Sequence, residues 1–108
     1  MSDAASGLDP RPGLIALIEA AERALAAEPN DGNSAVAGDI RTLMARVENA
    51  TPGGAPLHAQ IDATRKWLGV LEQPADHERF GGTPHIRDYV ITQLRLTRGA
   101  VEDYLRET

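Results

Sequence analysis

Clusters of proline and glycine cut the chain into four stretches, and in each stretch the apolar residues recur at the spacing of an α-helix. Proline and glycine near 29–32, 51–54 and 74–83 favour turns and end helices. The predicted helices run from about Pro10 to Glu28, from Asn33 or Ser34 to before Thr51, from Pro56 to before Pro74, and from Thr83 almost to the end. Four helices with short connections predict an all-α fold, a four-helix bundle in antiparallel up-down-up-down order. The alternative is a looser all-α fold with the first helix packed across the others.

Each predicted helix carries one apolar stripe that we expect to form the core. The spacing within each stripe is close to i, i+3, i+4 and i+7, and no segment alternates with the period of a strand. On the first helix, Glu19, Glu22 and Arg23 fall on the other side, where we expect solvent. The stripes are Leu14, Ile18, Ala21 and Leu25; Val36, Ile40, Leu43, Met44 and Val47; Leu57, Ile61, Thr64, Leu68 and Leu71; and Ile86, Val90, Leu94, Thr97, Val101 and Leu105.

Length and composition restrict the classes of function. The 108 residues fit one domain, which we expect at 9–108 after a disordered tail at 1–8. The absence of cysteine excludes disulfides, thiolate metal sites and cysteine nucleophiles. The formal net charge of −5 argues against binding to nucleic acid. No apolar run approaches the roughly 20 residues of a membrane span, so we expect no membrane partner and a cytoplasmic protein. Arginine supplies ten of the eleven basic residues, a bias typical of GC-rich bacterial genomes.

Apolar residues outside the stripes predict a second surface, which faces another molecule. Trp67 and Val70 on the third predicted helix and Tyr89 and Leu96 on the fourth lie beyond the core stripes, and aromatic residues are common interface anchors. The alternative is a wide apolar face that packs against two neighbouring helices. The leading hypothesis is a non-enzymatic helical interaction module without a cofactor. Its partner is protein, either a second copy in a homodimer or a different chain that it serves as adaptor or small accessory subunit.

The connection before the fourth predicted helix is the site of the alternative function. Two histidines and several carboxylates there suit a metal ion or an acid–base pair, and the arginine beside a helix N-terminus suits an anion. The protein would then bind a small ligand or metal, as an enzyme in one version. Otherwise Phe80 packs under the loop, the charged residues are solvated, and removing both histidines costs little stability. The candidate ligand residues are Asp76, His77, Glu78, Arg79, His85 and Asp88.

A second polar cluster is predicted on the third helix, where His58, Asp62 and Arg65 follow each other at i, i+4 and i+7. This spacing suits a metal, a proton relay or a solvated charge cluster. In antiparallel order His58 lies roughly 20–25 Å from the connection that carries His77, because each helical residue adds about 1.5 Å. That distance excludes a site built from all three histidines. The chain also lacks Gly-x-Gly-x-x-Gly, Walker and Gly-x-Ser-x-Gly motifs, and no catalytic residue is predicted.

Overall fold

The computed structural model describes residues 11–27 and 33–107, and this part of the chain is helical without strands. The all-α prediction is therefore confirmed. The predicted tail at 1–8 lies outside the described residues. The elements are the α-helices α2 (Arg11–Ala27), α3 (Asn33–Ala50), α4 (Ala55–Leu71) and α5 (Thr83–Glu107), and the 3-10 helix η2 (Pro74–Phe80).

The connection between α4 and α5 is more ordered than the sequence analysis predicted. We expected a loop there, but seven of its residues form η2, which begins with Pro74 and ends with Phe80, and Gly81 follows as its C-cap. Gly81 and Gly82 both have positive φ angles, 98° and 99°, a conformation that glycine adopts at little cost. These two glycines reverse the chain between η2 and the start of α5.

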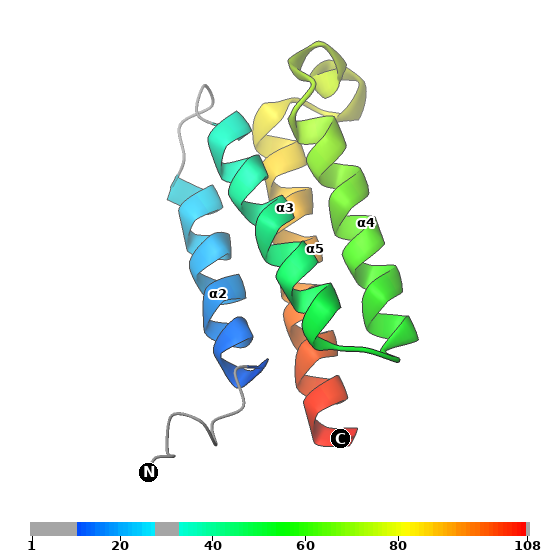
Figure 1. Cartoon of the computed structure of the whole chain (residues 1–108). Helices are drawn as coiled ribbons and strands as arrows, with labels where there is room; N and C mark the ends of the chain where they lie inside the picture. The colour runs from blue at the N-terminus through cyan, green and yellow to red at the C-terminus, as the bar shows by residue number, and fades with distance from the viewer. Residues whose placement is uncertain (1–10, 28–32, 108) are drawn as a thin grey trace.

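The four α-helices lie side by side, and consecutive helices run in opposite directions (Figure 1). Both α2 and α4 pack against α3 and α5, so every helix has two neighbours. The shared interior is the apolar core. None of the described helices combines the length and the apolar character needed to cross a membrane.

The predicted stripes supply this core. Most of their members are buried, and Ala21, Val36 and Leu105 are half-buried at its border. Ile91 lies outside the predicted stripe of α5, yet only 8% of it is exposed. It is buried because α2 covers that side of α5, where Ile91 lines a hollow together with residues of α2.

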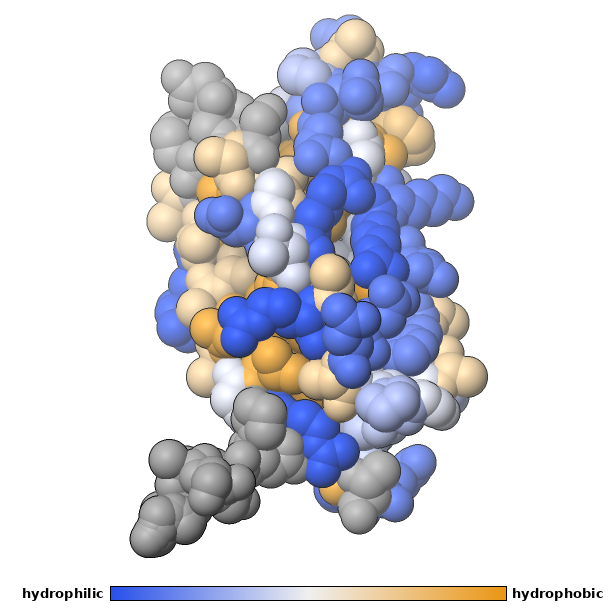
Figure 2. Space-filling model, in the orientation of Figure 1, coloured by the Kyte–Doolittle hydropathy of each residue, from blue (hydrophilic) through white to orange (hydrophobic). Residues whose placement is uncertain are grey.

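The outer surface is unevenly polar. In the view of Figure 2, hydrophilic side chains gather over α4 and apolar ones gather toward α2. The described helices therefore leave apolar surface on the α2 side of the molecule.

Candidate functional site

His77 lies at the end of the molecule where η2 connects α4 to α5. This histidine is only 5% exposed. Its Nε2 lies 3.1 Å from the Val70 carbonyl oxygen and 3.0 Å from that of Leu71. Both partners are acceptors, so Nε2 carries a proton and donates to the end of α4. Nδ1 lies 2.7 Å from the Thr83 hydroxyl at the start of α5. Both ring nitrogens of His77 are thus used to join α4, η2 and α5.

The other candidate ligand residues turn to separate partners. The Nε2 of His85 lies 3.0 Å from the Tyr89 hydroxyl, and Asp76 forms an ion pair of 3.3 Å with Arg79. Glu78 and Asp88 are exposed. Among the described residues, no group of three or more His, Asp or Glu side chains is arranged to hold a metal ion.

An aromatic cluster connects this end to the predicted interface. The Trp67 ring packs edge-on against Phe80, with centroids 5.5 Å apart, and lies 4.7 Å from the ring of Tyr89. Tyr89 also contacts the His85 ring at 4.7 Å. Phe80 therefore packs under the connection, as one of our alternatives expected, and Trp67 is held in place by contacts within the chain.

The predicted interface residues differ in exposure. Leu96 is 52% exposed and Tyr89 is 37% exposed. Trp67 and Val70 are half-buried and pack against the core. Leu96 and Tyr89 are seven residues apart on α5, a spacing that places them on the same side of a helix.

Polar contacts align α4 with α5 next to this surface. The Gln60 amide nitrogen donates to the Gln93 side-chain oxygen at 2.7 Å, and the hydroxyls of Thr64 and Thr97 lie 3.1 Å apart in the core. Each threonine also approaches a carbonyl one turn earlier on its own helix. Two hydroxyl protons serve these three contacts, so one threonine bonds across the helices while the other bonds to its own backbone.

The predicted cluster of His58, Asp62 and Arg65 is divided in the structure. Arg65 forms ion pairs with Asp62 at 3.2 Å and with Glu48 of α3 at 3.1 Å. The hydrogen bond with Arg65 lowers the pKa of the Glu48 carboxyl. The Thr51 hydroxyl donates to the Val47 carbonyl at 2.8 Å and so accepts a hydrogen bond from Nε2 of His58 at 3.2 Å. In the described part of the chain His58 and Asp62 share no hydrogen bond or ion pair, because the His58 ring turns to the end of α3 instead.

A buried carboxylate was missed by the sequence reasoning. Glu22 was expected in solvent, but it is only 9% exposed because α5 covers its side of α2. Its oxygens lie 3.3 Å from Nε of Arg95 and 3.0 Å from Nε of Arg98, and Arg98 also pairs with Glu19. The sequence contains one indication of these ion pairs: the two acidic residues on α2 are three positions apart, and so are the two arginines on α5.

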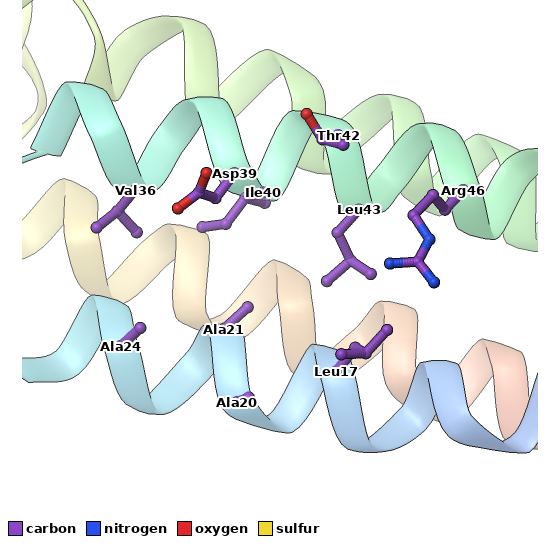
Figure 3. Close-up of a pocket in the computed structure, with 10 residues that line it drawn as sticks. All are labelled: Leu17, Ala20, Ala21, Ala24, Val36, Asp39, Ile40, Thr42, Leu43 and Arg46. Carbon is purple, nitrogen blue, oxygen red and sulfur yellow. The ribbon is translucent and has the colours of Figure 1, made fainter.

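An apolar groove between α2 and α3 was also missed. It encloses about 310 Å³, and Figure 3 shows small side chains of α2 opposite larger apolar side chains of α3. Asp39 and Arg46 stand on the α3 side of it. The lining residues are Leu17, Ala20, Ala21, Ala24, Val36, Asp39, Ile40, Thr42, Leu43 and Arg46.

The exposed side of α2 is itself apolar, which the sequence could have revealed. Surface helices usually place charged residues opposite their buried stripe. Arg23 is the only charged residue among the exposed positions in 11–27, and the remaining exposed positions include Ala16, Leu17, Ala20, Ala24 and Ala27. These alanines and the leucine recur at helical spacing, a pattern that we had not separated from the core stripe.

Comparison of the chain with models of protein families, with curated proteins and with solved structures finds no match.

Proposed function

We propose that the protein is a non-enzymatic interaction module, an antiparallel four-helix bundle that binds protein through the outer face of α4 and α5. The observation that carries the proposal is the exposure of Leu96, 52%, directly outside a closed apolar core. The partner is a second copy or a different protein that the module serves as adaptor or accessory subunit. Cytoplasmic location and bacterial origin stay predictions from the sequence.

Tyr89 supports this choice of face. Its ring already packs against the rings of Trp67 and His85. The Tyr89 side chain would therefore lose little conformational entropy when a partner binds. Interfaces gain affinity when their anchors are held in position in the free protein. Trp67 and Val70 extend the same apolar surface at its half-buried border.

The alternative, a ligand or metal site at the connection between α4 and α5, has less support. His77 is its central residue, and both nitrogens of that ring bond to the protein itself. A metal would have to compete with those bonds for a nitrogen lone pair. The remaining candidate residues are exposed or paired with one another in twos.

A photo-crosslinking amino acid at position 96 tests the proposed face in the cells that encode the protein. We expect a covalent product with a specific protein, which mass spectrometry identifies as a second copy or a different chain. The same amino acid at Glu102 is the control, because this exposed residue lies six positions from Leu96 and therefore about 120° around α5. Equal products from positions 102 and 96, or none from either, would contradict the proposal.

Charge substitution gives the complementary result with purified protein. Leu96→Asp should weaken binding to the identified partner at least about tenfold, because a carboxylate in an apolar interface must lose its water. Asn49→Asp adds the same charge at an exposed position of α3 on the side of α2, away from the proposed face, and should leave binding within about twofold. A similar effect of both substitutions would point to net charge instead of the proposed face.

A further inference from the structure

We propose that a second copy of this chain packs on the face formed by α2, α3 and the groove between them, so that the protein forms a two-fold symmetric homodimer. The inference names one partner for the interaction module proposed above, on a different face of the molecule. Three features carry it: the apolar exposed side of α2, the groove beside it, and a pattern of charge that is complementary to itself.

The exposed positions of α2 in 11–27 carry one charged residue, Arg23, where a solvent-facing helix normally carries several. Leu17, 39% exposed, stands beside the groove among exposed alanines. Because the main packing partners of α2 are α3 and α5, its remaining side is not covered by another of the described α-helices. Small side chains there allow a second helix to approach closely.

The two charged residues at the groove, Asp39 and Arg46, are exposed. In the residues that the structure describes, neither Asp39 nor Arg46 forms a side-chain hydrogen bond or an ion pair. Most arginines of α3, α4 and α5 are paired: Arg41 with Glu72, Arg65 with Glu48, and Arg98 with Glu22. Asp39 and Arg46 are thus available to a partner of opposite charge at each position.

These charges are arranged for a second copy. In a two-fold interface, if residue i contacts residue j of the other copy, then j contacts i. Asp39 and Arg46 are seven residues apart on α3 and share one side of the helix, since seven residues make nearly two turns. When two copies of α3 meet in antiparallel order around an axis between Thr42 and Leu43, each Asp39 faces the Arg46 of the second copy.

The apolar residues follow the same symmetry. Leu17 and Ala24 of α2 are also seven residues apart, and the midpoint between them falls between Ala20 and Ala21. Both of these alanines line the same groove as Thr42 and Leu43. Figure 3 shows Leu17 toward the Arg46 end of the groove and Ala24 toward the other end. One axis therefore also places each large Leu17 opposite the small Ala24 of the second copy.

Charge reversal tests the inference on the full chain, with native mass spectrometry and sedimentation over a concentration series. We expect the natural chain to be a dimer. In a dimer of Asp39→Arg or of Arg46→Asp, two pairs of like charges would face each other across the interface. Each substitution should therefore raise the dissociation constant of the dimer at least about tenfold. Both sites are exposed, so each variant should keep its fold, as circular dichroism checks. Glu102→Arg, an equal change of charge at an exposed site of α5, should leave the dimer intact.

Mixing the two variants gives the sharper result. Asp39→Arg has two positive residues at the groove and Arg46→Asp has two negative ones, so we expect them to form a one-to-one heterodimer when combined. The double variant Asp39→Arg/Arg46→Asp restores both pairs and should dimerise alone. A loss of packing within one molecule would produce neither rescue.

Three outcomes would overturn the inference. These are a natural chain that stays monomeric at every concentration, single reversals that leave the dimer unchanged, and single variants that fail to combine when mixed. If Leu96→Asp dissociates the dimer while the charge reversals do not, the homodimer forms through the face of α4 and α5, and the proposed interface at the groove is wrong. If position 96 yields no crosslink but the two charge-reversal variants form a heterodimer, the interface at the groove is supported and the proposed face of α4 and α5 is contradicted.

Discussion

A single imidazole ring joins three segments at one end of the molecule. His77 donates to two carbonyls at the end of α4 and bonds to Thr83 at the start of α5. Buried polar groups of this kind contribute little when paired but cost much when one partner is removed. At the scale of the residue, a histidine that we considered as a ligand is part of the framework.

His77→Ala should lower the free energy of unfolding by about 2–4 kcal/mol, because it leaves a cavity and removes the donor to buried carbonyls. This replaces our expectation that both histidines could be removed at little cost. Urea denaturation measures the change. His85→Ala, at an exposed position, is the control and should cost less than about 1 kcal/mol. Equal losses for the two variants would show that His77 does not join these segments.

Two glycines should respond to alanine with opposite signs. Gly81 has a φ of 98°, and a Cβ there would lie 2.8 Å from the His85 ring, so Gly81→Ala should destabilise the fold by about 1–2 kcal/mol. Gly99 lies within α5 with nothing within 4 Å of an added Cβ. Gly99→Ala should stabilise by about 0.5–1 kcal/mol through helix propensity. Thermal unfolding of both variants checks the prediction, and a shift of the same sign in both would refute it.

Ion pairs between helices act at the scale of the element. Arg41 of α3 holds Glu72 at the end of α4, and the hydrogen bond with Glu72 raises the pKa of the Arg41 guanidinium. Arg65 of α4 holds Glu48 of α3. In one ion pair the arginine is on α3, and in the other it is on α4. Because the two pairs join α3 and α4 at different positions along the helices, we expect them to oppose sliding of α3 along α4.

The Glu48 bridge predicts a dependence of stability on pH. In the folded protein the hydrogen bond with Arg65 lowers the pKa of the Glu48 carboxyl from its usual value of 4.5. Protonation of Glu48 therefore favours the unfolded chain. The contribution of this pair is complete above about pH 4.5 and is lost as the pH falls through the lower folded pKa. The stability difference between the natural chain and Glu48→Gln should therefore shrink in acid, as urea titrations from pH 7 to pH 3 would record. Glu102→Gln should show no such trend, and a constant difference for Glu48→Gln would contradict the prediction.

Helices and core were predictable because their signals are local. Proline, glycine and the 3.6-residue period mark the ends and the buried side of each element without knowledge of its neighbours. The burial of Glu22 depends on Arg95 and Arg98 of a distant helix, and the role of His77 depends on backbone carbonyls that no sequence pattern announces. The groove beside Leu17 requires knowing which side of α2 remains uncovered after packing.

At the scale of the whole molecule, one side is closed by its own ion pairs and the other presents apolar surface. Glu19 and Glu22 of α2 are neutralised by arginines of α5. The opposite side of α2 has alanines and Leu17 instead. This asymmetry is what directs a second copy to α2 and α3 in our proposal.

Salt should act on the proposed dimer in a way that depends on the variant. In the natural chain the paired charges of Asp39 and Arg46 attract across the interface, so raising sodium chloride from about 0.05 M to 0.5 M should weaken association modestly. In Asp39→Arg the same groups repel, and screening should strengthen association. Sedimentation at both concentrations measures the two slopes. Slopes of the same sign would mean that these charges do not meet.

The order of the helices along the chain is separate from their order in space. The Arg11 guanidinium lies 5.9 Å from the centre of the Tyr104 ring, so the start of α2 lies beside the last turns of α5 (Figure 1). Each helix touches the next around a closed ring, and the first touches the last. A circular permutant that links α5 to α2 and opens between Glu28 and Gly32 would keep every packed pair of helices. Because the packed pairs of helices form a closed ring, we expect the chain ends to be movable to another connection without loss of a helix–helix contact.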